Sequence, residues 1–98
     1  MRKYEMMLIF KPDLSDETIT EVKERLMKIL EDFQGEFVEE VAGWARRRMA
    51  YSIEDYQEGI YLLWHFNGQV ETVTELDRII KISDKILRHI IVKLDPKQ

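Results

Sequence analysis

Three consecutive arginines, Arg46 to Arg48, form the densest group of chemically active side chains in the sequence, and they lie between Trp44 and Tyr51. Guanidinium groups pair with phosphates through two parallel hydrogen bonds and stack on bases, while aromatic rings offer further stacking surfaces. The pattern therefore favours contact with RNA. The sequence supports a structural interpretation equally well. In that interpretation the arginines protect an edge strand from aggregation, or form ion pairs with Glu39 and Glu40. Since neighbours on a strand point to opposite faces, at most two of the three share one surface.

The charge is unevenly distributed along the chain. The formal net charge is -4, which as an average argues against nucleic acid. Residues 11–40 hold ten acidic against four basic residues, whereas the remainder holds eleven basic against nine acidic residues. The basic residues outside the arginine run include Arg2, Lys3, Arg88 and Lys93 on the expected first and last strands. The helices are therefore expected to be acidic, and parts of the sheet and its rim basic.

Residues that would support catalysis or metal binding do not form a recognisable pattern. The two histidines, His65 and His89, fall in different expected strands, and no His, Asp or Glu set has metal-ligand spacing. Zero cysteines exclude disulfides, thiolate zinc sites and cysteine nucleophiles, and no glycine-rich phosphate loop occurs. We expect no catalytic residue, no metal, no cofactor and no small-molecule substrate. The apolar run Met6–Phe10 is too short for a membrane span, so a cytoplasmic protein without a membrane partner is expected.

The elements that must position these side chains follow from apolar spacing and turn residues. Ser15 is the expected N-cap of an amphipathic helix, with Asp16 and Glu17 in its first turn. A turn is expected over Asp55–Gly59, and a bulge near Ala42-Gly43. The expected elements are a strand at Tyr4–Phe10, a helix from Asp16 to about Phe33, a strand at Gly35–Ala45, a strand at Ile60–Phe66, a helix of about twelve residues from Val70, and a strand at Ile86–Val92.

The order β-α-β-β-α-β predicts an α+β fold of the ferredoxin-like kind, a four-stranded antiparallel sheet with two helices on one face. At this length we expect one domain over residues 1–98. One sheet face is left uncovered in such a fold. Met7, Ile9, Trp64 and Phe66 would add apolar area there if their faces are uncovered, but the sequence leaves open which alternate set faces the helices.

The ordered motifs resemble the bacterial small-subunit ribosomal protein S-six family, over essentially the whole chain. The motifs are Met1-Arg2-Lys3-Tyr4-Glu5 with Lys11-Pro12-Asp13-Leu14; Trp44-Ala45-Arg46-Arg47-Arg48-Met49-Ala50-Tyr51-Ser52-Ile53 with Gly59-Ile60-Tyr61; and Leu87-Arg88-His89-Ile90-Ile91-Val92-Lys93. The sequence departs from the family pattern at several positions. Ala45 stands where the family usually has Gly, Met49 stands where Leu is common, and Ser52 stands where Pro is common. Glu54-Asp55 also replaces a stretch that is usually rich in Lys.

The resemblance implies a structural component of the small ribosomal subunit that supports translation without catalysis. It implies binding to 16S-type ribosomal RNA as a heterodimer with a small basic ribosomal protein, S-eighteen. Whether Tyr4 and Tyr51 stack on bases or pack internally stays open. The RNA-contact residues that it implies are Arg2, Lys3, Tyr4, Arg46, Arg47, Arg48, Tyr51 and Arg88.

An alternative is a ferredoxin-like small-molecule-binding or enzymatic module that forms a homodimer through its sheet. Its best feature is the aromatic strand that contains Tyr61, Trp64, His65 and Phe66, which could line an apolar pocket. The loop glycines and convergent polar groups of such pockets are missing from the sequence. A stable homodimer would favour this alternative, and a monomer the ribosomal interpretation.

Overall fold

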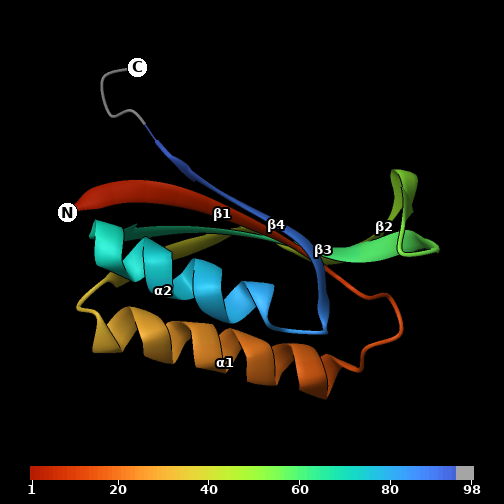
Figure 1. Ribbon diagram of the computed structural model, residues 1–98, viewed down its shortest axis with the longest axis horizontal. Helices are drawn as coiled ribbons and strands as arrows, with labels where there is room; N and C mark the ends of the chain where they lie inside the picture. The colour runs from red at the N-terminus through yellow and green to blue at the C-terminus, as the bar shows by residue number, and fades with distance from the viewer. Residues whose placement is uncertain (95–98) are drawn as a thin grey trace.

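Six elements follow one another in the expected order in a computed structural model, which describes residues 1–94 apart from the side chains of residues 42–44 (Figure 1). The predicted ferredoxin-like α+β fold is confirmed. No helix among the described residues is long and apolar enough to cross a membrane. The elements are β1 (Arg2–Phe10), α1 (Asp16–Asp32), β2 (Glu36–Ile53), β3 (Tyr56–Gly68), α2 (Val70–Lys81) and β4 (Ile86–Lys93).

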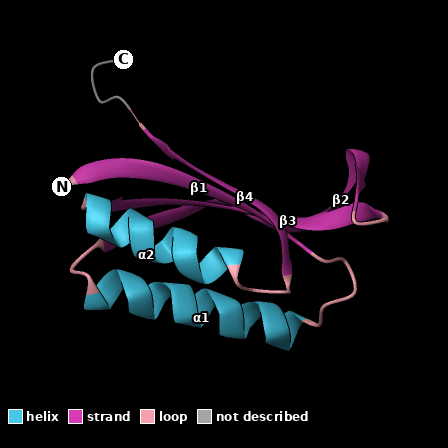
Figure 2. Cartoon of the chain, in the orientation of Figure 1, coloured by secondary structure: helices cyan, strands magenta, loops and turns pink. Residues whose placement is uncertain are grey.

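The four strands form one antiparallel sheet in the order β2-β3-β1-β4. Both helices lie against one face of this sheet, and the opposite face, which we call the open face, carries no helix (Figure 2). The two central strands are β1 and β3, while β2 and β4 form the edges. Because β1 and β4 pair, Lys93, which is opposite Tyr4, lies near Lys3, whereas Arg88, which is opposite Ile9, lies at the other end of β1.

The longer helix, α1, begins where its capping residues predict. The Ser15 hydroxyl accepts a hydrogen bond from the Thr18 backbone N–H at 3.2 Å, and Asp16 and Glu17 place negative charge in the first turn. Both features stabilise a helix N-terminus. The apolar stripe of α1 is buried against the sheet at Ile19, Leu26, Ile29 and Leu30.

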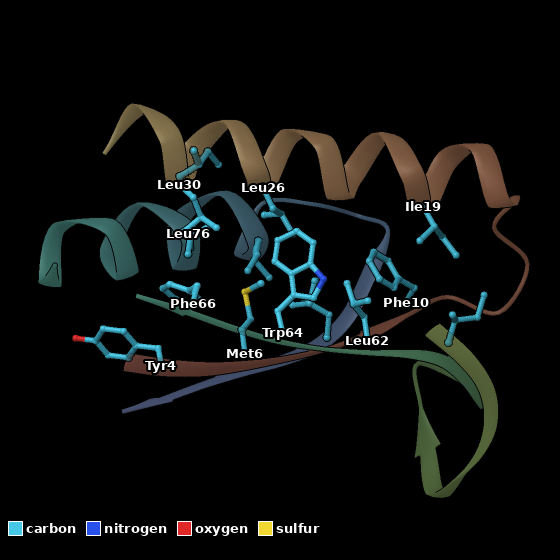
Figure 3. Packing of buried hydrophobic residues seen from close by; sticks show 14 residues of the cluster. Tyr4, Met6, Phe10, Ile19, Leu26, Leu30, Leu62, Trp64, Phe66 and Leu76 are labelled. Carbon is cyan, nitrogen blue, oxygen red and sulfur yellow. The ribbon is translucent and has the colours of Figure 1, made fainter. Parts of the chain in front are cut away.

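Alternation along β1 and β3 divides the residues of these strands between the two faces. The buried side chains come together beneath the helices in Figure 3. Trp64 and Phe66 are no more than 1% exposed, so neither contributes to the open face. On the open face, Met7 is half-buried and Ile9 is buried. The strand residues in the core are Tyr4, Met6, Leu8, Phe10, Ile60, Leu62, Trp64 and Phe66.

The hairpin between β2 and β3 differs from the prediction. The turn is not at Asp55–Gly59: β2 continues to Ile53, only Glu54 and Asp55 turn, and β3 resumes at Tyr56. Both turn residues have positive φ, 52° and 70°, as the tight turns that match strand twist require. Gly59 favoured a turn in the sequence, but in the structure this glycine allows β1 and β3 to approach closely. A Cβ added there would lie 2.4 Å from Ile9 Cγ2 on β1.

The strand β2 is irregular, and its register against β3 shifts in four places. Two of the shifts flank Ala42, so the predicted bulge in this region is confirmed. An extra residue in one strand increases the local twist and bends the strand. The distal part of the hairpin accordingly curls away from the helices, toward the side of the open face (Figure 3).

A polar network ties β2 and β3 to α1 on the helix side. Trp64 Nε1 donates to Glu40 Oε1 at 3.0 Å, and Lys23 Nζ lies 2.9 Å from the same oxygen. Burial acts to raise the pKa of the Glu40 carboxyl, but the hydrogen bonds from Trp64 and Lys23 outweigh it and lower the pKa below its ordinary value. The network therefore stabilises the fold while Glu40 is ionised.

Replacing Glu40 with Gln should lower the free energy of unfolding at pH 7 by about 1 kcal/mol, since a charge-assisted pair is lost. Because the folded pKa of Glu40 is depressed, its contribution is present above the unfolded pKa and is lost as the pH falls through the folded value. Urea unfolding between pH 3 and pH 7 should show the two proteins converge in acid. A constant difference would contradict this assignment, and Glu24→Gln, an exposed change on α1, is the control.

Replacing Gly59 with Ala should destabilise the protein by about 1 to 3 kcal/mol, because the new methyl group would overlap the buried Ile9 side chain. Gln57→Ala, an exposed change on the same strand, is the matched control and should have little effect. Urea midpoints report both. An unchanged midpoint for the Gly59 variant would show that β1 and β3 are not in close contact here.

Candidate nucleic-acid and partner interface

The three arginines lie on β2, an edge strand of the sheet. Arg46 is opposite the core residue Ile60, and Arg47 is opposite Gly59. Arg46 and Arg48 therefore share the helix side of the strand, whereas Arg47 belongs to the open side. All three are exposed. The side chain of Trp44, which flanks them in the sequence, lies outside the described residues.

Neighbouring carboxylates form no ion pair with the three arginines in the described part of the chain. Arg46 Nη1 donates to the Pro12 carbonyl oxygen. Within the part of the chain that the structure describes, no hydrogen bond or ion pair engages the guanidinium of Arg47 or Arg48. The carboxylates proposed as structural partners have other contacts: Glu40 holds Lys23 and Trp64, and Glu39 Oε2 lies 3.8 Å from His65 Nδ1. Two guanidinium groups thus remain available to phosphates.

Tyr51 and Arg88 meet although they are 37 residues apart in the sequence. Arg88 Nη1 donates to the Tyr51 hydroxyl at 2.6 Å, and the guanidinium lies 5.6 Å from the centre of the ring. The curl of the hairpin causes this contact, since it brings Tyr51 from β2 to the open side of β4. The Tyr51 ring is still 60% exposed, so it can stack on another planar group.

A groove of about 290 Å³ lies between the curled hairpin and the sheet. Met7, Tyr61 and Ile90 contribute from the sheet, and Met49 and Tyr51 from the hairpin. The groove is predominantly apolar, with Arg88 at its margin. The sequence pattern did not indicate it, because it depends on the curl of the hairpin.

Arg2 and Lys3 lie at the opposite end of the sheet from the arginine run. Arg2 is opposite Gly68, and Arg47 is opposite Gly59 on the same strand. Nine residues of strand span about 30 Å, so the two basic regions cannot contact the same phosphate. Arg2 and Lys3 share a groove of about 560 Å³ with Lys93.

The ring of Tyr4 belongs to the core. Tyr4 is 7% exposed and stacks on Phe66, with the ring centres 5.5 Å apart (Figure 3). A base could reach this ring only if the core rearranged. Of the two tyrosines that the sequence left open, Tyr4 packs internally and Tyr51 is exposed, so only Tyr51 is available to stack on a base.

The two histidines lie on opposite faces, each beside a carboxylate. On the open face His65 Nε2 is 2.9 Å from Glu5 Oε2, and on the helix side His89 Nε2 is 2.6 Å from Asp77 Oδ1. The hydrogen bond to His89, with a second to Lys81, lowers the pKa of the Asp77 carboxyl. No group of three or more potential ligands that could hold a metal ion occurs among the described residues.

The family model and the curated relatives that match this chain belong to one family. Residues 3–93 match the family model of Ribosomal protein S6. The small ribosomal subunit protein bS6 of Syntrophomonas wolfei is 59% identical over 97 residues, which cover 99% of this chain and all of the relative. That of Desulforudis audaxviator is 44% identical, over 97% of this chain and all of the relative. The crystal structure of 30S ribosomal protein S6 from Thermotoga maritima superposes with a TM-score of 0.86 at 26% identity, over 95% of this chain and 87% of that one.

Proposed function

Because the chain belongs to the ribosomal protein S6 family, we propose that it binds small-subunit ribosomal RNA as a heterodimer with the small basic ribosomal protein S-eighteen. As a family member it is a structural, non-catalytic protein of the small ribosomal subunit, located with the ribosome in the bacterial cytoplasm. Its contribution to translation is to the architecture of the subunit.

The proposal rests on the exposure of Arg47 and Arg48 and on the contacts of their guanidinium groups. Both are exposed on an edge strand, and neither has a hydrogen bond or ion pair within the described residues. A guanidinium with no protein partner can give its paired donors to a phosphate without first breaking an internal contact. Arg46 contributes charge beside them, although its Nη1 is held by Pro12.

Arg88 and Tyr51 would extend the RNA contact across the sheet. Their mutual hydrogen bond fixes the guanidinium beside an exposed ring. That pairing offers a phosphate or base two kinds of contact at once, charge and stacking. Arg2 and Lys3, about 30 Å from Arg47 by strand spacing, would reach a separate part of the RNA.

A basic partner resolves the difficulty of an acidic RNA-binding protein. The chain carries a net charge of -4, so long-range repulsion opposes its approach to RNA. A cationic partner that binds first would offset this repulsion and add phosphate contacts of its own. We therefore expect weak RNA binding by the chain alone and tight binding by the heterodimer.

The alternative of a small-molecule module loses its main support. Trp64 and Phe66 are buried beneath the helices, whereas Tyr61 and His65 point to the other face. The four residues therefore cannot line one pocket. The family is non-enzymatic, in agreement with a binding role.

The first test compares RNA affinity with and without the partner. Filter binding at fixed salt, with a small-subunit RNA fragment, should give a dissociation constant at least tenfold lower for the heterodimer than for the chain alone. The physical reason is the added positive charge of the partner. Equal affinities, or no binding by either form, would contradict the proposal.

The second test removes two arginines. In the heterodimer, Arg47→Ala with Arg48→Ala should reduce the slope of log affinity against log salt by about one for each phosphate that is no longer neutralised. Arg25→Ala, an exposed change on α1, alters net charge without touching the edge strand and should leave the slope nearly unchanged. Should the slope of the double variant equal that of the wild type, the arginines would have a structural role only.

A further inference from the structure

The distal part of the β2-β3 hairpin, which curls toward the open side, is incompletely paired (Figure 3). After Arg48, which is opposite Glu58, the next register pair is Ile53 with Tyr56, so four residues of β2 lie opposite a single residue of β3. Extra residues in one strand are left out of the ladder of hydrogen bonds and bend the strand. Side-chain contacts, rather than the ladder, must therefore hold residues 49–52 in place.

Two side chains of this segment, those of Met49 and Tyr51, make such contacts. Met49 is 8% exposed and lies against Gly59, where an added Cβ would be 3.6 Å from the Met49 sulfur. Tyr51 reaches β4, where Arg88 Nη1 donates to its hydroxyl at 2.6 Å and the guanidinium lies 5.6 Å from the ring centre. Of the described residues 49–52, Tyr51 alone forms a side-chain hydrogen bond, and that bond leads to a strand outside the hairpin.

The base of the curled part has a separate attachment on the helix side. Arg46 Nη1 donates to the Pro12 carbonyl oxygen, in the loop between β1 and α1. This contact precedes the extra residues of β2, and it therefore leaves the bend beyond Arg48 to other contacts. The position of the distal hairpin over the open face depends on the bond between Tyr51 and Arg88.

Electrostatic repulsion opposes the curl. Arg47 lies on the open side of β2, and Arg88, opposite Ile9, lies on the open side of β4. Both are cations, so they repel each other as the curl brings the hairpin toward β4. The neutral phenol of Tyr51 offsets this repulsion, because its oxygen accepts a hydrogen bond from the Arg88 guanidinium and its ring attracts a cation.

We propose that Tyr51 is a positioning residue for RNA binding: through Arg88, its hydroxyl holds the hairpin in the curled position from which Arg47 and Arg48 reach RNA. The inference rests on the proposed function and adds to it a role that involves no contact between the hydroxyl and RNA. A binding segment that is already arranged loses less conformational entropy when it binds, and its affinity is higher for that reason. The described contacts of residues 49–52 provide that arrangement in the free chain.

The ring and the hydroxyl of Tyr51 have different roles in this proposal. The hydroxyl is engaged by Arg88, whereas the residue as a whole stays 60% exposed. The ring can therefore stack on a base while the hydroxyl keeps its bond to Arg88. Tyr51→Phe separates the two roles, because it removes the hydroxyl and keeps the ring and the arginine.

The first measurement compares the position of the hairpin in the RNA-free chain for Tyr51→Phe and Tyr56→Phe. The second variant is a matched control: Tyr56 is a half-buried tyrosine of the same hairpin whose hydroxyl has no hydrogen bond within the described residues. Spin labels on Gln57→Cys and Glu24→Cys, two exposed positions in a chain without other cysteines, report the distance from the hairpin to α1. Electron paramagnetic resonance should give a narrow distance distribution for the wild type and the Tyr56 variant, and a broader one for the Tyr51 variant.

The second measurement is RNA affinity in the heterodimer with S-eighteen. Tyr51→Phe should raise the dissociation constant for a small-subunit RNA fragment about three- to tenfold, because a smaller fraction of the chain holds the hairpin in the binding position. The slope of log affinity against log salt should equal that of the wild type, since no phosphate contact is lost. Tyr56→Phe should change neither quantity.

The outcomes separate the inference from the proposed function. If the wild-type heterodimer does not bind the RNA, the proposed function is wrong and the inference falls with it. If the wild type binds and Tyr51→Phe matches Tyr56→Phe in distance distribution or in affinity, the inference alone is overturned. Weaker binding without a broader distribution would make the hydroxyl a direct RNA contact. A reduced salt slope would also overturn the inference, because the hydroxyl would then serve to place Arg88 on a phosphate.

Discussion

The alternation of side chains along the central strand β1 is the constraint on which the rest of the structure depends. One set of residues, Tyr4, Met6, Leu8 and Phe10, is buried beneath the two helices. The intervening set is thereby forced to the open face, and pairing transmits the choice to β3 and β4. A shift of one residue would exchange the faces and bury Glu5 in the core, so the register is strongly specified.

This separation of faces explains how an acidic chain can serve an RNA assembly. Of the ten acidic residues between positions 11 and 40, the larger share lie on or beside α1, in the helix layer. Exposed charges are screened over about 8 Å at physiological salt, which is less than the distance of about 10 Å between packed layers. Arg47 and Arg88 on the open side are therefore partly insulated from the acidic helix. Average charge is a poor guide to such a surface.

The sequence predicted the fold well because its strongest signals are local. The N-cap at Ser15 and the apolar stripe of α1 depend on neighbours within a few residues, and both are confirmed. The prediction of a turn over Asp55–Gly59 was wrong. Gly59 is required by the close approach of a residue distant in sequence, Ile9, and not by a turn in the local backbone. Glycine composition alone does not distinguish a turn from a close approach between strands.

The site was only partly predictable, for the same reason. Alternation predicted that the arginines would divide between two faces, and the register confirms it. The contact of Tyr51 with Arg88, and the position of His65 beside Glu5, depend on pairing between strands far apart in the sequence. The sequence left open whether Trp64 and Phe66 face the helices, because both faces of β3 carry large apolar or aromatic residues. Only the position of the helices decides between them.

On this account the open face and the curled hairpin, rather than the two helices, form the surface used in assembly. Nuclear magnetic resonance of the methyl-labelled chain, titrated first with S-eighteen and then with RNA, tests it most directly. The account predicts that the methyl signals of Met7, Leu63 and Ile90 shift when the partner is added, while those of exposed α2 residues such as Val70 do not. Shifts confined to α1 and α2, with the open face unchanged, would contradict it.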